Sequence, residues 1–257
     1  MTNQFEGDLL LAHRLADEAR RVATSWFGGV VNERTKPDGS IVTDADEAVE
    51  DALRALLADE RPGDAVLTEE RGQSGTSERR WIIDGIDGTA SFVRGGHEWG
   101  TLIALEVTSE VVLGLAEQPI SRRRYWATRG SGAYVVSDVG VGSARRLRVS
   151  NVDQIACART CITQWPGDER SRRAAERLSA TCRESPPEDH PALQVAWGGC
   201  EVAVVYQAGP WDLAAPTVIV EEAGGRFSDF DGGGRLDARC GLFTNGLVHE
   251  AALRMLL

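Results

Sequence analysis

Residues 81–92, WIIDGIDGTASF, place two acids and the start of a helix directly after an apolar run. The run at 81–83 is typical of a short strand that is buried on both faces. Asp84 and Asp87 follow it at once, and carboxylates held close together repel each other unless a cation lies between them. The stretch therefore predicts a sheet-containing protein with a charged site at the end of a buried strand.

Apolar residues set the pattern of helices and strands along the first half of the chain. Their helical spacing predicts helices over residues 5–26 and 43–57. The segment between them, residues 28–43, carries the turn residues Pro37 and Gly39 and is predicted to be a flexible loop. Apolar runs farther along predict strands within residues 64–70, 80–87, 100–107, 110–119 and 123–136.

The second half mixes the same two patterns after a predicted domain boundary near residue 143, where SDVGVGSA is small and loop-like. Interleaved helices and strands in both halves favour a layered α/β or α+β fold, with one domain over residues 1–143 and a second over 144–257. The predicted elements are a helix at 168–182, a loop at 184–191, a helix or strand at 193–206, and a helix at 210–225 that ends in two glycines.

The composition excludes some classes of partner. Net charge is −11 and the pI is near 4.9, so we expect no cationic surface for a nucleic-acid backbone. The N-terminus lacks a basic region followed by an apolar core, and no apolar stretch approaches the length of a membrane span. We therefore expect a cytoplasmic protein with no membrane partner. The five cysteines form no C-x-x-C pair, which favours free thiols over a zinc site.

Five acids stand at the ends of apolar elements. Each group also has an ordinary structural explanation: TEE at 68–70 as a solvated loop end, DGIDG at 84–88 as a turn, and the acid of WDLAA at 211–215 as a helix N-cap. The presence of all three groups in one chain instead predicts a site for magnesium, which prefers such oxygen ligands. The five acids are Glu69, Glu70, Asp84, Asp87 and Asp212.

Gly88 and Thr89 add a place for an anion beside these acids. A helix that begins here would direct unpaired backbone N–H groups at a phosphate, and glycine permits a close approach. The Thr89 hydroxyl is either a helix cap or a group that orients a water molecule. Asp46, in IVTDAD, is by itself most simply an acid in the first turn of a helix.

These motifs resemble those of the inositol monophosphatase superfamily of magnesium-dependent, lithium-sensitive phosphatases. The resemblance rests on IVTDAD at 41–46, LTEE at 67–70, WIIDGIDGTASF at 81–92 and WDLAAPTVIVEEAGG at 211–225. It implies an α+β fold, the five-layer αβαβα sandwich of the inositol monophosphatase and fructose-1,6-bisphosphatase type, usually as a homodimer. It also implies hydrolysis of a small phosphorylated metabolite with two or three Mg²⁺ per subunit.

The resemblance carries metal-binding roles to particular residues of this chain. Glu69, Asp84 and the carbonyl of Ile86 would hold one magnesium ion. Asp84, Asp87 and Asp212 would hold a second. The implied reaction is an in-line displacement at phosphorus, in which the protein mainly positions the ester and neutralises its charge.

It also implies roles in catalysis and phosphate binding. Glu70 would support the metal ligands or help to hold a more loosely bound ion. Thr89 and Asp46 would orient or deprotonate the attacking water, and the backbone N–H groups of Gly88 and Thr89 would contact the phosphate. Lys36 would lie in the mobile loop that covers the site in relatives.

A longer stretch, DGTASFVRGGHEWGTLIALE at 87–106, is similar to the actinobacterial histidinol-phosphate phosphatase branch. Histidinol phosphate is therefore the expected substrate. On the same basis, Arg94 and Trp99 would shape the substrate pocket. Without the resemblance, both residues would more simply be structural.

One departure from the family bears on the substrate. Val205, seven residues before Asp212, stands where many relatives carry an acid that binds the hydroxyls or the amine of the substrate. Histidinol carries an amine and would need an acidic contact, for which Glu188, Asp189 and Glu201 are the candidates. A sugar or cyclitol phosphate, as in specialised metabolism, is therefore the alternative substrate. A non-catalytic regulatory homologue is the alternative of another class.

Overall fold

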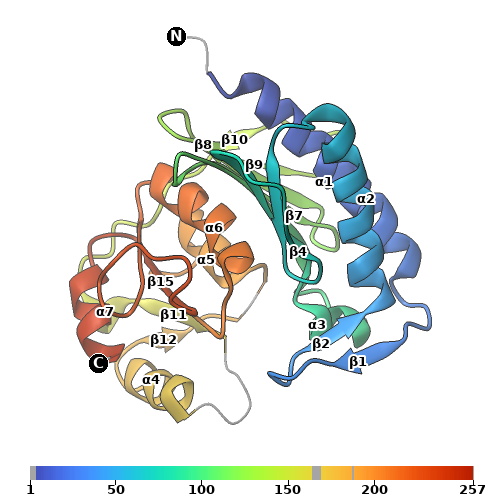
Figure 1. The fold of residues 1–257 in the computed structure, drawn as a ribbon. Helices are drawn as coiled ribbons and strands as arrows, with labels where there is room; N and C mark the ends of the chain where they lie inside the picture. Colours follow the sequence, from blue (N-terminus) through green and yellow to red (C-terminus); the bar gives the residue numbers. More distant parts are fainter. Residues whose placement is uncertain (1–3, 164–168, 187, 257) are drawn as a thin grey trace.

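The computed structural model describes residues 4–163, 169–186 and 188–256, which form five layers (Figure 1). Two long helices cover the outer face of a large sheet, two helices lie between this sheet and a smaller one, and two more cover the far side. The predicted αβαβα sandwich is therefore confirmed. In layer order, the helices are α1 (Glu6–Trp26) and α2 (Asp44–Glu60), α5 (Pro191–Ala196) and α6 (Pro210–Glu222), and α4 (Glu169–Ser179) and α7 (His249–Leu256).

The larger sheet has eight strands: β3 (Ala65–Thr68), β4 (Gly72–Ser74), β5 (Arg79–Asp87), β6 (Gly100–Val107), β7 (Glu110–Gln118), β8 (Arg123–Thr128), β9 (Gly132–Ser137) and β10 (Arg145–Arg146). Their order is β10-β9-β8-β7-β6-β5-β3-β4. Strands β3 and β5 run parallel, with Thr68 opposite Ile83. Glu69 and Asp84 are the next residue of each strand path, so these two acids lie side by side where β3 ends.

The smaller sheet has five strands: β11 (Arg159–Ile162), β12 (Arg183–Glu184), β13 (Val202–Tyr206), β14 (Arg226–Ser228) and β15 (Cys240–Thr244). Their order is β12-β11-β13-β15-β14. The segment 193–206, predicted as a helix or a strand, contains both, because most of α5 and all of β13 lie within it.

Helix α6 holds Asp212 between the two sheets. Every residue from Leu213 to Val220 is buried, as a helix packed on both sides requires. Strand β7 approaches the helix closely, since a Cβ atom on Gly114 would lie 2.4 Å from the Ala215 carbonyl oxygen. Only glycine permits this distance without displacement of the backbone. The first turn of α6 is therefore fixed against the large sheet.

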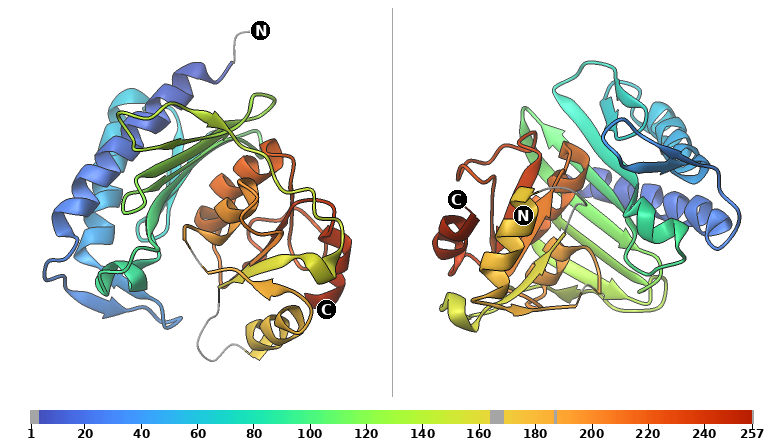
Figure 2. Two further views of the ribbon diagram at one scale, coloured as in Figure 1. Left: turned by 180° about the vertical axis from the view of Figure 1, so that it is seen from behind. Right: turned by 90° about the horizontal axis from the view of Figure 1, so that it is seen from below.

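The predicted flexible loop at 28–43 is only partly correct. It contains a two-stranded hairpin, β1 (Glu33–Thr35) and β2 (Ile41–Thr43), closed by a turn in which the N–H of Lys36 donates to the carbonyl of Ser40 at 2.8 Å. The extended residues on either side of the turn pair with each other, which loop-forming composition did not reveal. Figure 2 shows the hairpin beside helix α3 (Thr89–Val93) at one end of the large sheet.

Three further expectations concern the domain boundary, the cysteines and membrane-spanning helices. The domain boundary near residue 143 stays a prediction, and β10, at 145–146, still pairs with β9. The five cysteines are free thiols, as expected, with Cys157 exposed and the other four buried. Within the described ranges, none of the helices combines the length and apolar character that a membrane crossing requires.

Candidate metal and phosphate site

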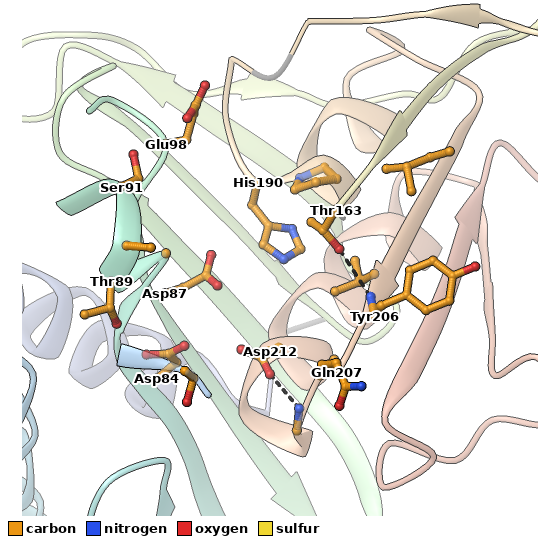
Figure 3. A pocket seen from close by; sticks show the side chains of 18 of the residues that line it. Asp84, Asp87, Thr89, Ser91, Glu98, Thr163, His190, Tyr206, Gln207 and Asp212 are labelled. Atoms are coloured by element: carbon orange, nitrogen blue, oxygen red, sulfur yellow. Dashed lines mark hydrogen bonds between the residues drawn. The ribbon is translucent and has the colours of Figure 1, made fainter. Parts of the chain in front are cut away.

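Three carboxylates from separate elements meet at the end of β3. Glu69 follows β3, Asp84 lies in β5, and Asp212 lies in the first turn of α6; one oxygen of each lies within 4.8 Å of the others. Asp212 is not the N-cap of its helix, since Gly209 takes that position and donates its N–H to Asp212 at 2.5 Å. Figure 3 shows Asp84 and Asp212 facing the same opening, with Asp87 beside them.

Burial and mutual repulsion disfavour negative charge in this cluster. Burial raises the pKa of Glu69 to about 8, that of Asp212 to about 7 and that of Asp87 to about 6. The pKa of Asp84 is raised well above its usual value, first by burial and then by the charges of the other three acids. A divalent cation would relieve this repulsion, and a donor set made of carboxylate oxygens fits the hard cation Mg²⁺.

Lys36 supplies the nearest positive charge. Its ammonium group lies 2.6 Å from a carboxylate oxygen of Glu69 and 2.7 Å from one of Glu70. Although burial lowers the pKa of Lys36, the two carboxylates raise it above its ordinary value. The hairpin that carries Lys36 is therefore tied to the acids that follow β3.

Glu50, which the sequence analysis did not single out, positions the same strand end. It is buried in α2, and its carboxylate accepts the backbone N–H groups of Glu70 at 2.9 Å and Arg71 at 3.0 Å. Burial raises its pKa. An acid one turn after Asp46, next to the buried Val49 of an amphipathic helix, is the sequence signal that could have identified it.

Gly88 forms a tight corner before α3. Its φ angle is +83°, and a Cβ atom there would lie 2.5 Å from the carbonyl oxygen of Glu98. No other residue fits this corner without a shift of the backbone. Helix α3 begins at Thr89, so the predicted helix start is confirmed.

Thr89 and Asp46 lie in direct contact. The Thr89 hydroxyl lies 2.8 Å from a carboxylate oxygen of Asp46 and 3.2 Å from the carbonyl oxygen of Ile86, so it can donate to either. Asp46 also accepts hydrogen bonds from the backbone N–H and the hydroxyl of Thr43, as the acid of a capping box at the start of α2. Burial raises the pKa of Asp46. The acid is thus both a structural cap and a partner of Thr89.

A cavity of about 850 Å³ opens beside these residues, lined by both halves of the chain. Of the residues expected to shape the substrate pocket, Arg94 and Asp189 line it. Trp99 does not; its ring is buried against Phe92 and Phe27. The expectation that Trp99 shapes the substrate pocket is therefore corrected, because this ring packs in the apolar core between the large sheet and helices α1 and α2.

The candidate acids for an amine are already engaged. Asp189 accepts hydrogen bonds from Ser121, Arg123 and Tyr125 at 2.8, 2.9 and 2.5 Å. Glu188 is exposed, and it lies near Arg123 on a second hollow of about 540 Å³.

Glu201 is buried outside the cavity, and its carboxylate lies 2.8 Å from the Arg159 guanidinium. The expectation that Glu188, Asp189 or Glu201 offers a free carboxylate to substrate is thus not met by the structure. Arginines from distant parts of the chain form ion pairs with all three carboxylates.

Two residues that the sequence analysis did not single out line the cavity instead. His190 lies at the N-cap of α5, with its ring directed into the cavity, and Glu98 lies across the opening from it (Figure 3). Val205 also lines the cavity, so an apolar side chain does face the substrate region. A histidine before a proline in a polar loop gives no sequence signal of such a position.

Comparisons with known proteins agree on one family. The model of the Inositol monophosphatase family matches residues 7–255. A histidinol-phosphatase from Mycobacterium tuberculosis is 38% identical over 255 residues, 97% of this chain and 97% of that protein. A Streptomyces griseus protein named glucose-1-phosphate thymidylyltransferase is 43% identical over 91% of this chain and 90% of its own length. The solved structure of an inositol monophosphatase from Zymomonas mobilis gives a TM-score of 0.85 at 28% identity, with 99% of each chain covered.

Proposed function

Because the chain belongs to the inositol monophosphatase family and is a phosphoric monoester hydrolase, we propose that it uses Mg²⁺ to hydrolyse a small phosphorylated metabolite. The approach of Glu69, Asp84 and Asp212 to within 4.8 Å of one another carries this proposal. Buried carboxylates so close together are costly without a cation. A non-catalytic homologue would have no need of them.

The metal ligands are assigned in two groups. Glu69, Asp84 and the carbonyl of Ile86 would hold one ion, and Asp84, Asp87 and Asp212 would hold a second. Bound Mg²⁺ would supply the positive charge that stabilises both the attacking and the leaving oxygen of an in-line displacement.

The remaining site residues would handle the water and the phosphate. The Thr89 hydroxyl would orient the attacking water, and Asp46, which lies 2.8 Å from that hydroxyl, would take up a proton. The backbone N–H groups of Gly88 and Thr89 would bind phosphate oxygens. Glu70 would support a more loosely bound ion, and Lys36 would withdraw from it when that ion binds.

Two classes of leaving group are candidates. The Mycobacterium tuberculosis relative supports histidinol phosphate. The apolar Val205 and the engagement of Asp189 by three donors support a sugar or cyclitol phosphate, whose uncharged hydroxyls need no counter-charge.

The release of phosphate from p-nitrophenyl phosphate tests the proposed reaction. We expect turnover with Mg²⁺, none after chelation, and inhibition by millimolar lithium. The Glu6→Gln variant, altered at an exposed position at the start of α1, is the control for the preparation. Metal-independent turnover, or none with Mg²⁺, would contradict the proposal.

Two further measurements test the reaction type and the oligomeric state. Incubation with dTTP and glucose 1-phosphate should give no pyrophosphate, which a thymidylyltransferase would release. Light scattering should give the mass of a homodimer, the assembly that we propose for the chain.

A further inference from the structure

One part of the cavity wall, away from the metal ligands, carries no charged side chain. This leaving-group wall consists of Thr163, Ser185, His190 and Val205, all from the second half of the chain. The Thr163 hydroxyl is engaged by the backbone, since it lies 3.2 Å from the N–H of Tyr206 and 3.3 Å from the carbonyl of Val204. Val205 offers only methyl groups. The Ser185 hydroxyl lies 3.5 Å from the side-chain amide of Gln194. Within the described residues, the polar group of this wall that is left for a ligand is therefore His190.

His190 has a defined tautomer. Its Nδ1 accepts the backbone N–H of Ala192 at 3.2 Å, so in the neutral ring the proton lies on Nε2. Burial lowers the pKa of His190 to about 4, which keeps the ring neutral near pH 7. Among residues 4–163, 169–186 and 188–256, Nε2 has no hydrogen-bond acceptor. Figure 3 shows the ring projecting into the cavity between Asp87 and Thr163.

The carboxylate next to His190 is not available as a counter-charge for a cationic leaving group. Asp189 is held by Ser121, Arg123 and Tyr125. Away from the metal ligands, the carboxylates of the described cavity lining that form no ion pair are all exposed and lie outside this wall: Asp38, Glu98, Glu184 and Asp237. A cationic leaving group that lay against the leaving-group wall would thus face an N–H donor rather than a counter-charge.

We propose that His190 recognises the leaving group by donating its Nε2–H to a hydroxyl or ether oxygen, and so selects an uncharged, hydroxyl-rich leaving group over an ammonium-bearing one. This inference rests on the proposed phosphatase function and specifies its substrate. An ammonium group has no lone pair to accept this hydrogen bond, whereas every hydroxyl has one. The apolar Val205 would lie against the carbon skeleton of the same group.

The role is recognition and not proton transfer. A neutral imidazole keeps its Nε2 proton near pH 7, so it cannot act as the general acid that protonates the leaving oxygen. Removal of the donor should therefore change KM more than kcat, and it should leave the pH profile of kcat/KM between pH 6 and 9 unaltered.

Two substitutions separate the donor from the helix cap. In His190→Asn, the side-chain oxygen can still accept the Ala192 N–H, as asparagine does at N-caps, but the side chain is too short to reach the Nε2 position. In His190→Gln, the amide can reach the Nε2 position, but the cap is lost. We expect His190→Gln to lower the Tm by about 2–4 °C and His190→Asn to lower it less.

The experiment compares kcat/KM for three esters with Mg²⁺: inositol 1-phosphate, histidinol phosphate and p-nitrophenyl phosphate. The wild-type protein should prefer the inositol ester to histidinol phosphate. In His190→Asn, the ratio of kcat/KM for the inositol ester to that for the aryl ester should fall about 10-fold, through KM. In His190→Gln, this ratio should stay within about 3-fold. Glu188→Gln, two residues away and outside the cavity, is the matched control.

Other outcomes would overturn the inference. A preference for histidinol phosphate that is lost in Glu98→Gln and kept in His190→Asn would assign recognition to Glu98. An equal loss for the inositol and aryl esters in His190→Asn would reduce His190 to a structural cap. If the wild-type protein hydrolyses none of the esters, the proposed function fails. Calorimetry then gives the dissociation constants of inositol 1-phosphate and histidinol phosphate for the wild-type protein and the His190 variants. Their comparison decides the role of His190.

Discussion

The two ends of the cavity are built on opposite electrostatic principles. At the metal end, Glu69, Asp84 and Asp212 bring negative charge together although burial raises the pKa of each. At the leaving-group wall, Val205 is apolar and His190 is a neutral donor. The metal end needs a cation for its working form, whereas the wall needs none.

This difference separates catalysis from recognition. Metal ions held by carboxylates can act on the phosphate of any small ester, so the metal end carries little information about the rest of the substrate. A single free hydrogen-bond donor on an uncharged wall discriminates between leaving groups by whether they can accept its hydrogen bond. Changes at the first end should affect all substrates alike, and changes at the second should alter their ranking.

The largest effect is expected from Asp84→Asn. Loss of this shared ligand should lower kcat for every ester by at least about 10³-fold. Saturating Mg²⁺ should raise the Tm of the wild-type protein by about 5 °C or more, since a ligand at 100 times its Kd stabilises by about 2.7 kcal/mol. This rise should be absent from the variant. Without metal, the variant should unfold at a higher temperature than wild type, because one repelling carboxylate is gone. Activity and thermal melts measure both effects, and substantial Mg²⁺-dependent turnover would refute the assignment.

A smaller, equally uniform loss is expected from Thr89→Ala. Removal of the hydroxyl that contacts Asp46 should lower kcat about 10²-fold for all esters. Binding of Mg²⁺, followed as the shift in Tm, should persist because no ligand is removed. Thr89→Ser, which keeps the hydroxyl, should recover most of the rate. A serine variant as slow as the alanine variant would indicate that the methyl group matters and the hydroxyl does not.

A change of ranking is expected from Val205→Glu. An acid on the leaving-group wall would supply the counter-charge that an amine lacks there, so kcat/KM for histidinol phosphate relative to inositol 1-phosphate should rise about 10-fold. Val205→Gln, of similar size and uncharged, is the control. An unchanged ranking in the glutamate variant would show that this position does not face the leaving group.

The smallest effect is expected from Lys36→Gln. Loss of the ammonium that lies 2.6 Å from Glu69 should destabilise the metal-free protein by about 1 kcal/mol, because the acids lose their nearest cation. The rise in Tm on addition of Mg²⁺ should then be larger than in wild type. Thermal melts with and without Mg²⁺ measure the difference. An equal rise in the two proteins would mean that Lys36 and the metal do not substitute for each other.

Local sequence patterns predicted much of the fold and the metal end. The apolar run before Asp84 predicted β5, helical spacing predicted α1 and α2, and two glycines predicted the end of the helix that is α6. These elements are encoded by residues near one another in sequence, so their periodicity can be read directly. The hairpin around Lys36 was missed because its stability depends on cross-strand pairing, which composition does not report.

The leaving-group wall could not be predicted in the same way. Glu188, Asp189 and Glu201 looked equally available in the sequence, and nothing near them indicates that Arg123 and Arg159 engage their carboxylates. Glu50 was likewise missed, since its partners are backbone N–H groups 20 and 21 residues away.

The sequence by itself thus determined which chemistry this protein carries. Short motifs set acids, a glycine corner and a threonine at fixed offsets on a strand and two helices. Local backbone geometry fixes where residues of one motif lie relative to one another, so these motifs predict the chemistry of the site. Only the tertiary structure decided which polar groups stay free to meet a substrate. A side chain is free when no distant partner reaches it, and that depends on the packing of elements that lie far apart in the chain. For this reason Asp84 could be predicted from its own motif, while His190 was found only once α5 was packed against the cavity.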